Sequence, residues 1–260
     1  MGTALVTGAT SGIGEEFCWQ LAAAGHDVVL VARREDALAA LAASLTNVAG
    51  VNAEYIAADL STEDGCARVA ARLDVGGQAD AQKPDLRPVD LLVNNAGFGL
   101  GSPFLDNSLE REINGLNVMV RAVMTLAHHA GISMRSRGRG AILNVGSVAS
   151  RTGAGTYSAH KAWVVAFTEG LAAELKGSGI TATVVCPGPV ATSFFANAGI
   201  DLGGRLAVAT PERVVADALQ AVRAGRVQTT PTLTYKAAMA AMKVAPRALV
   251  LRAMRFLPHM

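Results

Sequence analysis

Short apolar runs rich in β-branched residues alternate with alanine-rich stretches of helical periodicity along most of this chain. The runs that we predict as strands cover residues 4–7, 28–31, 51–57, 89–94, 140–146, 180–186 and 227–230. The helical patterns between them cover residues 13–24, 35–46, 62–74, 107–136, 157–176 and 211–224. Strands that are apolar on both faces, each followed by a helix, require a parallel sheet covered on both sides. The sequence therefore predicts an α/β fold with a doubly wound, seven-stranded parallel sheet.

The chain of 260 residues is long enough for one such domain, which we place at residues 1–230. Residues 231–260 are predicted as an appended helical segment. The net charge of +2 gives no argument for a nucleic-acid partner. The charge is uneven, however: 16 basic and 21 acidic residues lie up to Asp217, and seven basic and no acidic residues follow it. The basic, apolar segment 231–260 could rest on an anionic membrane, cover an apolar substrate pocket, or pack on the domain with its charges in solvent.

The cysteines and the N-terminus indicate the compartment. Cys18, Cys66 and Cys186 are odd in number, far apart and set in apolar runs, which favours a reducing, cytoplasmic location over a disulfide framework. Residues 3–7 enter an apolar strand without the basic and apolar regions of a signal peptide, so we expect a chain that is not secreted. The uncharged stretch 177–200 contains two prolines and predicts a strand and a loop rather than a membrane helix.

A glycine-rich turn follows the first strand and opens the first helix. It reads Thr7-Gly8-Ala9-Thr10-Ser11-Gly12-Ile13-Gly14. Gly8 permits the tight turn, Gly12 lets the backbone approach a pyrophosphate, and Gly14 lets the helix pack on the sheet. The free N–H groups at the helix N-terminus would then hold the diphosphate of a dinucleotide. This position in the sequence favours a Rossmann-type dinucleotide site over a glycine turn without a ligand.

The second predicted strand ends at Ala32-Arg33-Arg34, where such a fold reads the adenosine ribose. An acidic residue there would accept from the hydroxyls of NAD, whereas an arginine pairs with a 2′-phosphate. Arg33 and Arg34 therefore favour NADP(H) over NAD(H). The alternative is that both are solvated and pair with Glu35 and Asp36 nearby.

Tyr157 and Lys161 are four residues apart at the start of a predicted helix and share one face of it. A nearby ammonium favours the phenolate, so we expect Lys161 to move the pKa of Tyr157 toward working pH. Such a tyrosine can exchange a proton with an alcohol or carbonyl oxygen. The alternative is a surface pair without chemistry.

Seven motifs now stand in order along the chain, and with them it resembles the short-chain dehydrogenase/reductase family over about residues 3–230. The motifs are Thr7 to Gly14, Asp59-Leu60, Asn94-Asn95-Ala96-Gly97, Asn117, Asn144-Val145-Gly146-Ser147, Tyr157 to Lys161, and Pro187-Gly188 followed by Thr192. The resemblance implies that Tyr157 is the general acid in carbonyl reduction. It implies that Lys161 lowers the pKa of Tyr157 and holds the nicotinamide ribose. It also implies that Ser147 donates a hydrogen bond to the substrate oxygen. Asn117 would hold a water that links Lys161 to solvent.

The resemblance also implies cofactor contacts beyond Arg33 and Arg34. Asp59 would contact adenine, Asn95 to Gly97 would line the cofactor, and Val190 and Thr192 would hold its carboxamide. The full set of expected contacts is Gly8, Thr10, Ser11, Gly12, Ile13, Gly14, Arg33, Arg34, Asp59, Leu60, Asn95, Ala96, Gly97, Tyr157, Lys161, Pro187, Gly188, Val190 and Thr192. Plain turn and loop hydrogen bonding is the alternative for Asp59, Asn94 and Asn95.

The spacing of ten positions from Ser147 to Tyr157 is tighter than the family pattern, which predicts a shortened loop and a more open substrate site. Ser150 is the alternative to Ser147 as the catalytic serine, and we prefer Ser147 because it directly follows the predicted strand.

The apolar residues after the fourth and sixth strands predict a hydrophobic substrate pocket, although they could equally pack the loops: Phe98, Leu100, Phe104, Phe194 and Phe195. The five histidines form no metal-ligand pattern, so no metal site is expected.

These features together predict an NADP(H)-dependent oxidoreductase that interconverts a hydrophobic carbonyl compound and its alcohol. The alternative is a non-catalytic NADP(H)-binding sensor or interaction module on the same fold. The chain has no room for the substrate domain of a sugar-nucleotide epimerase or dehydratase. The helices at 107–136 and 157–176 have broad apolar faces, and members of the resembled family commonly pair such helices. Together these features predict a homodimer or homotetramer.

Overall fold

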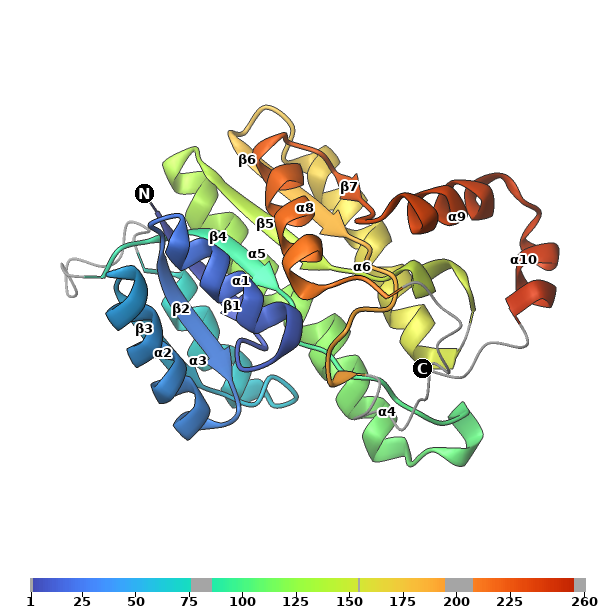
Figure 1. Ribbon diagram of the computed structural model, residues 1–260, viewed down its shortest axis with the longest axis horizontal. Helices are drawn as coiled ribbons and strands as arrows, with labels where there is room; N and C mark the ends of the chain where they lie inside the picture. Colours follow the sequence, from blue (N-terminus) through green and yellow to red (C-terminus); the bar gives the residue numbers. More distant parts are fainter. Residues whose placement is uncertain (1, 76–85, 154, 195–207, 255–260) are drawn as a thin grey trace.

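The computed structural model describes residues 2–75, 86–153, 155–194 and 208–254. In this part of the chain the seven predicted strands form one parallel sheet in the order β3-β2-β1-β4-β5-β6-β7 (Figure 1). The strands are β1 (Thr3–Thr7), β2 (Asp27–Ala32), β3 (Ala53–Ala57), β4 (Val89–Asn94), β5 (Gly140–Val145), β6 (Ile180–Val185) and β7 (Gln228–Thr229). The predicted doubly wound α/β fold is confirmed.

Helices cover both faces of the sheet, as the apolar character of the strands requires. One face carries α1 (Gly12–Ala23), α2 (Glu35–Ala49) and α8 (Pro211–Arg223), and the other carries α3 (Glu63–Leu73), α5 (Ala122–Arg137) and α6 (Gly155–Glu174). Successive residues of a strand point to opposite faces. Thus Val6 of β1 packs in the cluster under α1, α2 and α8, whereas Leu5 packs in the cluster under α3 and α5.

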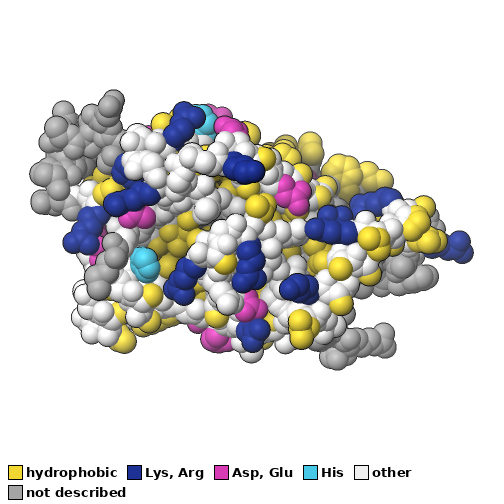
Figure 2. Space-filling view, turned by 90° about the horizontal axis from the view of Figure 1, so that it is seen from above, with side chains coloured by type: hydrophobic (Ala, Val, Ile, Leu, Met, Phe, Trp, Pro, Cys, Tyr) yellow, Lys and Arg dark blue, Asp and Glu magenta, His cyan; other side chains and the backbone are white. Residues whose placement is uncertain are grey.

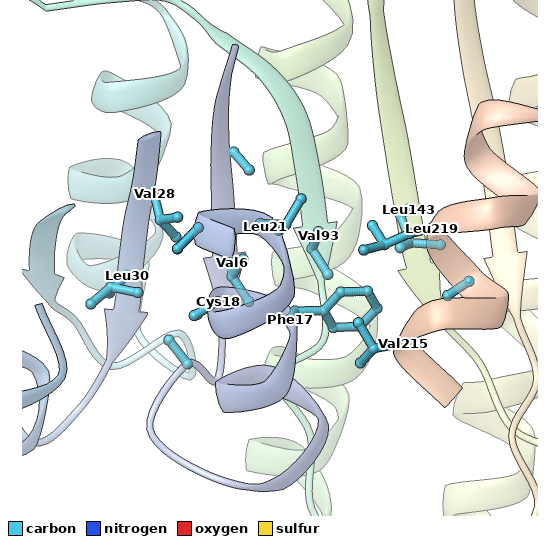
Figure 3. Packing of buried hydrophobic residues seen from close by; sticks show 14 of the residues in the cluster. Val6, Phe17, Cys18, Leu21, Val28, Leu30, Val93, Leu143, Val215 and Leu219 are labelled. Atoms are coloured by element: carbon cyan, nitrogen blue, oxygen red, sulfur yellow. The ribbon is translucent and has the colours of Figure 1, made fainter. Parts of the chain in front are cut away.

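The first of these two clusters joins the two halves of the sheet. Phe17 of α1 is fully buried and lies beside Val215 of α8 (Figure 3). Val93 and Leu143 from β4 and β5 belong to the same cluster. Burying a side chain of this size contributes about 1.5–3 kcal/mol to stability. The packing therefore fixes α1, and the glycine turn before it, relative to β4 and β5.

The predicted helix 107–136 is interrupted near its start. The structure has α4 (Leu109–Leu116), a π-helical turn η2 (Asn117–Arg121) and then α5, which ends at Gly138 with φ 66°. The backbone N–H of Ala122 donates to the carbonyl oxygen of Asn117, five residues back. Such single π turns occur frequently at functional sites.

The segment after residue 230 is helical, as predicted. It contains α9 (Leu233–Val244) and α10 (Arg247–Met254), and Met239 of α9 packs in a cluster with Val164 and Val165 of α6. Figure 2 shows Lys, Arg and hydrophobic side chains together at the end of the molecule that α9 and α10 occupy. The division into a domain at 1–230 and a segment at 231–260 stays a prediction.

Two further observations concern the expected compartment. Cys18, Cys66 and Cys186 are all buried free thiols. None of the helices within the described residues is both long enough and apolar enough to cross a membrane.

Candidate active site

A cavity of about 510 Å³ opens at the carboxyl ends of the central strands. Its wall is formed by the turn after β1, the loops after β4, β5 and β6, the first turns of α4 and α6, and one face of α9. β1 pairs with both β2 and β4, so the chain changes direction across the sheet at this point. In open α/β sheets ligands bind in the crevice at such a switch point.

The glycine-rich turn forms one end of the cavity. Gly8 and Gly12 have φ of 68° and 54°, which L side chains rarely adopt. A Cβ on Gly14 would lie 2.0 Å from the carbonyl oxygen of Gly8, so only glycine fits there. Ser11 caps α1 without a side-chain capping bond to any described residue, and Ser11 and Ile13 line the cavity beside Gly8 and Gly12. The backbone N–H groups at this helix end can therefore face an anion. Thr10 and Gly14 shape the turn and are not part of the cavity wall.

The loop after β4 is tied to the end of β1. Thr7 Oγ1 accepts hydrogen bonds from the backbone N–H groups of Asn95 and Ala96, each at 3.0 Å. The Asn95 side-chain amide donates to the carbonyl oxygen of Thr7 at 2.9 Å. These bonds hold Asn95, Ala96 and Gly97 in the cavity wall beside the glycine turn. Asn94 instead donates to Asn144 at 2.9 Å inside the sheet, which is a structural role.

The predicted adenosine-binding residues lie outside this cavity, at the ends of the neighbouring strands β2 and β3. Arg33 and Arg34 are exposed, and neither pairs with an acidic side chain in the described part of the chain. The alternative in which they pair with Glu35 and Asp36 is therefore not observed. Asp59 is exposed and accepts from the N–H of Ser61 at 2.9 Å, and Leu60 is buried.

Ser147, Tyr157 and Lys161 meet on the cavity wall. Ser147 lies two residues after the end of β5, and Tyr157 and Lys161 lie one turn apart in α6. The Ser147 hydroxyl acts on the Tyr157 phenol, whose pKa it lowers. Lys161 Nζ donates to the carbonyl oxygen of Val145 at 2.7 Å and lies 5.8 Å from the centre of the Tyr157 ring.

Burial dominates the electrostatics of this group. Burial raises the pKa of Tyr157 above its ordinary value, and the Ser147 side chain offsets only part of that rise. The pKa of Tyr157 thus moves in the opposite direction from the one expected of a nearby ammonium. Lys161 is buried too, which lowers its pKa to about 8. Its proton is therefore exchangeable near neutral pH, while Tyr157 stays a protonated phenol.

The two candidate serines differ in their position relative to the cavity. Ser147 lines the cavity and its Oγ accepts from the N–H of Ala149 at 3.1 Å, capping the short helix η3 (Val148–Arg151). Ser150 is buried inside η3, away from the cavity wall, and its Oγ has no partner among the described residues.

Asn117 does not reach the cavity wall in this structure. It opens the π-helical turn, and two residues later Met119 packs against Tyr157 in a small cluster. A Cβ on Gly97 would touch both Met119 and, at 3.6 Å, Lys161 Nζ. The π turn therefore lies close behind the Tyr157 and Lys161 pair.

Only some of the apolar residues expected in the pocket line the cavity. Phe98 and Phe194 line it, and the Phe194 ring centre is 5.7 Å from that of Tyr157. Leu100 is buried behind the wall, and Phe104 is half exposed outside it. Phe195 lies outside the described residues.

Three prominent wall residues were missed from the sequence: Arg111 of α4, and Tyr235 and Met242 of α9. A Cβ on Gly188 would lie 2.4 Å from the Tyr235 ring, so α9 packs directly on the loop after β6. The basic, apolar character of residues 231–260 allowed a cover over an apolar pocket, but no spacing in the sequence connects Tyr235 to Gly188.

The C-terminal helices also border the segment between Ser147 and Tyr157, where a shortened loop was expected. Arg247 of α10 donates to the carbonyl oxygen of Arg151 at 2.7 Å, and a Cβ on Gly153 would lie 2.5 Å from Leu251. The expected gap in the wall is thus bordered by α9 and α10. Within the described residues, no group of three or more His, Cys, Asp or Glu side chains could hold a metal ion.

Comparisons with known proteins agree with this geometry. The family profile described as short chain dehydrogenase matches residues 2–202. A Streptomyces virginiae protein named as a ketoacyl reductase of the monensin polyketide synthase is 40% identical over 202 residues, covering 73% of this chain and 70% of that protein. A short-chain dehydrogenase from Sphingobium yanoikuyae in complex with NADPH superposes with a TM-score of 0.84 at 34% identity, covering 96% and 94% of the two chains. The bulky-bulky ketone specific alcohol dehydrogenase from Comamonas testosteroni gives a TM-score of 0.77 at 28% identity, covering 99% of both.

Proposed function

The chain belongs to the short-chain dehydrogenase family, and from that premise we propose that it is an NADP(H)-dependent enzyme interconverting a hydrophobic carbonyl compound and its alcohol. Membership makes the chain an oxidoreductase acting on CH–OH and C=O groups with a nicotinamide dinucleotide. The observation that carries the finer proposal is the meeting of Ser147, Tyr157 and Lys161 on a cavity that also opens on the glycine turn.

The wall fits the cofactor. The positive φ of Gly8 and Gly12 shapes a turn that lines the cavity beside the N-terminus of α1, where its N–H groups would hold a diphosphate. Asn95 to Gly97 would face the cofactor from the β4 loop. The remaining contacts would come from the loop after β6, through Pro187, Gly188, Val190 and Thr192. When bound, NADPH supplies the hydride that reduces the carbonyl carbon.

The preference for NADP(H) is supported by Arg33. Its guanidinium is exposed at the end of β2 and has no acidic partner among the described residues, so it is available to a 2′-phosphate. Arg34 lies next to it, and Asp59 would contact the adenine from the end of β3. The relative bound to NADPH supports the same preference.

The proton chemistry belongs to Tyr157. In reduction its phenol would protonate the substrate oxygen, and burial favours that role because it keeps the phenol protonated. Ser147 would donate to the same oxygen and stabilise the negative charge developing on it. Lys161 would hold the nicotinamide ribose and favour the phenolate that remains. Asn117 would connect Lys161 to solvent.

The substrate side of the cavity is apolar. Phe98, Val148, Phe194 and Met242 line it, and no Asp or Glu does so among the described residues. This lining supports a hydrophobic carbonyl compound. α9 would act as a cover over the substrate, with Tyr235 and Met242 facing it.

The direct test measures NADPH oxidation by the purified protein against a panel of hydrophobic ketones and aldehydes. We expect turnover by the unmodified protein and its loss in Tyr157→Phe, with NADPH affinity retained because the ring stays in place. A fully active Tyr157→Phe protein would refute the assignment. Tight NADPH binding without turnover on any compound would favour the sensor or interaction module.

Contact of the C-terminal segment with a membrane stays a prediction. Leu233, Val244 and Leu249 are 84%, 86% and 61% exposed, and Lys236 and Arg252 are exposed near them. Co-sedimentation with phosphatidylserine vesicles tests it. We expect binding that is lost in a Lys236→Glu and Arg252→Glu double variant and absent with phosphatidylcholine. Equal recovery of the two proteins would exclude the membrane role.

We also propose a homodimer or homotetramer in the cytoplasm. The apolar side chains Leu109, Ile113, Leu116 and Met124 are 46–68% exposed along α4 and α5 and would be covered by a second copy. Light scattering at micromolar protein measures the mass, and a monomer would contradict the proposal. The three buried free thiols are consistent with a reducing compartment.

A further inference from the structure

Arg111 places a cation on the wall of an otherwise apolar pocket. It lies in the first turn of α4 and lines the cavity on the side of Phe98, over whose ring its guanidinium carbon lies at 5.9 Å. Phe98 packs in the cluster that includes Tyr157, so Arg111 belongs to the catalytic end of the cavity rather than to the glycine turn.

The guanidinium is held in place by the backbone. Its Nε donates to the carbonyl oxygen of Leu100 at 3.1 Å, and its Nη2 donates to that of Gly99 at 3.2 Å. Arginine has five N–H donors in a planar fork, so three remain. A group that is already oriented loses less conformational entropy when it binds a ligand.

No carboxylate of the described residues neutralises this cation. The nearby Glu112 is buried and engaged elsewhere: it accepts from the Asn107 amide at 2.8 Å and from the Thr156 hydroxyl at 2.5 Å. Glu110 is exposed and makes no ion pair with Arg111. The other cation of the wall, Lys161, is buried and donates to Val145. Arg111 is thus the exposed, unpaired cation of the described cavity wall.

We infer that Arg111 binds an anionic oxygen group of the substrate, so that the preferred substrates are hydrophobic carbonyl compounds carrying a carboxylate or a phosphate. The apolar wall would take the hydrocarbon part, and the planar fork matches both kinds of oxyanion. This inference rests on the proposed function for the reaction itself, but it concerns a binding contact that can be measured without turnover.

The test is calorimetric titration of the protein saturated with NADPH. The probes are decanoate, decyl phosphate and methyl decanoate, which share a hydrocarbon chain and differ in charge. We expect at least one of the two anions to bind about tenfold more tightly than the neutral ester, and the advantage to fall at high salt. Decanoate alone would assign a carboxylate, and decyl phosphate alone a phosphate.

Variants of Arg111 distinguish binding of the anionic group from mere support of the loop at residues 99–100. Arg111→Gln should bring the favoured anion to the affinity of the ester, Arg111→Lys should keep part of the difference, and Arg135→Gln on the exposed end of α5 should change nothing. Equal affinity of anions and ester in the unmodified protein would overturn the inference. So would an Arg111→Gln protein that weakens all three probes alike, because that pattern indicates only support of residues 99–100. If Arg111→Gln does not fold, Arg111→Lys and the salt dependence decide.

The kinetic counterpart uses medium-chain oxo acids and their methyl esters. The acid should have a KM about tenfold below that of its ester, with a similar kcat. Absence of turnover on both the acids and the esters would count against the proposed function. The calorimetric test of Arg111 would still apply, because it does not depend on turnover.

Discussion

The ammonium of Lys161 lies 5.8 Å from the centre of the Tyr157 ring and donates a hydrogen bond of 2.7 Å to the carbonyl oxygen of Val145. Both side chains are buried, so both are driven toward their neutral forms: the pKa of Tyr157 is raised, and that of Lys161 is lowered to about 8. The pair therefore holds a phenol ready to donate beside an amine that titrates near neutral pH.

This relationship predicts the pH dependence of reduction. Below about pH 8 Lys161 is charged and would stabilise the phenolate left after proton transfer, whereas above about pH 8 this charge is lost. We expect kcat for reduction to be level at neutral pH and to decline as the pH rises through about 8. Stopped-flow measurement of the hydride step across this range checks it.

The matched variant is Lys161→Arg, which keeps its charge across the range. In this protein the decline should move to higher pH, even if its rate is lower. A flat profile of the unmodified protein on both sides of pH 8 would contradict the role given to Lys161.

Ser147 and Ser150 provide a paired test of the oxyanion donor. Ser147→Ala should lower kcat by about 10²–10³-fold, the usual cost of removing one such donor. Ser150→Ala should leave kcat unchanged, because the Ser150 hydroxyl lies off the cavity wall without a partner among the described residues. Steady-state kinetics at saturating NADPH measures both, and the reverse pattern would move the catalytic role to Ser150.

The strands were predictable because their signal is local. A run such as Val28 to Val31 is apolar at every position, and only burial on both faces of a sheet accounts for that. Ser147 could be placed at the site for a similar reason, since it directly follows a buried strand. Residue 53 rather than 51 begins the third strand, because the register with β2 starts with Ala53 opposite Val28.

Other features depend on contacts between distant segments. The sequence gives Arg111 and Phe98 no special spacing, and their contact exists only because α4 folds back over the loop after β4. Tyr235 reaches Gly188 in the same way, from a helix that follows the last strand. The direction of the Tyr157 pKa shift was predicted wrongly, because the sequence reveals the nearby lysine but not how deeply the phenol is buried.

Arg33 should govern the choice between the two dinucleotides. A hydrogen-bonded contact with a phosphate is worth about 1.5–3 kcal/mol, so Arg33→Ala should raise the Kd for NADPH by roughly 10–100-fold. The Kd for NADH should stay the same, because it has no 2′-phosphate. Fluorescence titration with each dinucleotide measures both constants. Arg135→Ala, another exposed arginine, is the control, and an equal effect of Arg33→Ala on NADH would refute the phosphate contact.

A Gly14→Ala substitution tests the close packing between α1 and the glycine-rich turn. A Cβ added at this position would lie 2.0 Å from the carbonyl oxygen of Gly8 and 2.5 Å from the Asn95 amide, so Gly14→Ala must push α1 away from the turn. Overpacking of this kind costs about 1–3 kcal/mol of unfolding free energy. We expect NADPH affinity to fall as well, because the N–H groups that would face the diphosphate move with α1.

Gly131→Ala on α5 is the matched control for Gly14→Ala. A Cβ there meets nothing within 4 Å, and alanine favours a helix over glycine by about 1 kcal/mol. That variant should be as stable as the unmodified protein or more so, with unchanged NADPH affinity. Urea unfolding and NADPH titration of both variants give the comparison. A Gly14→Ala protein that binds NADPH normally would show that the turn tolerates a side chain, and the diphosphate would then have to lie elsewhere than at the N-terminus of α1.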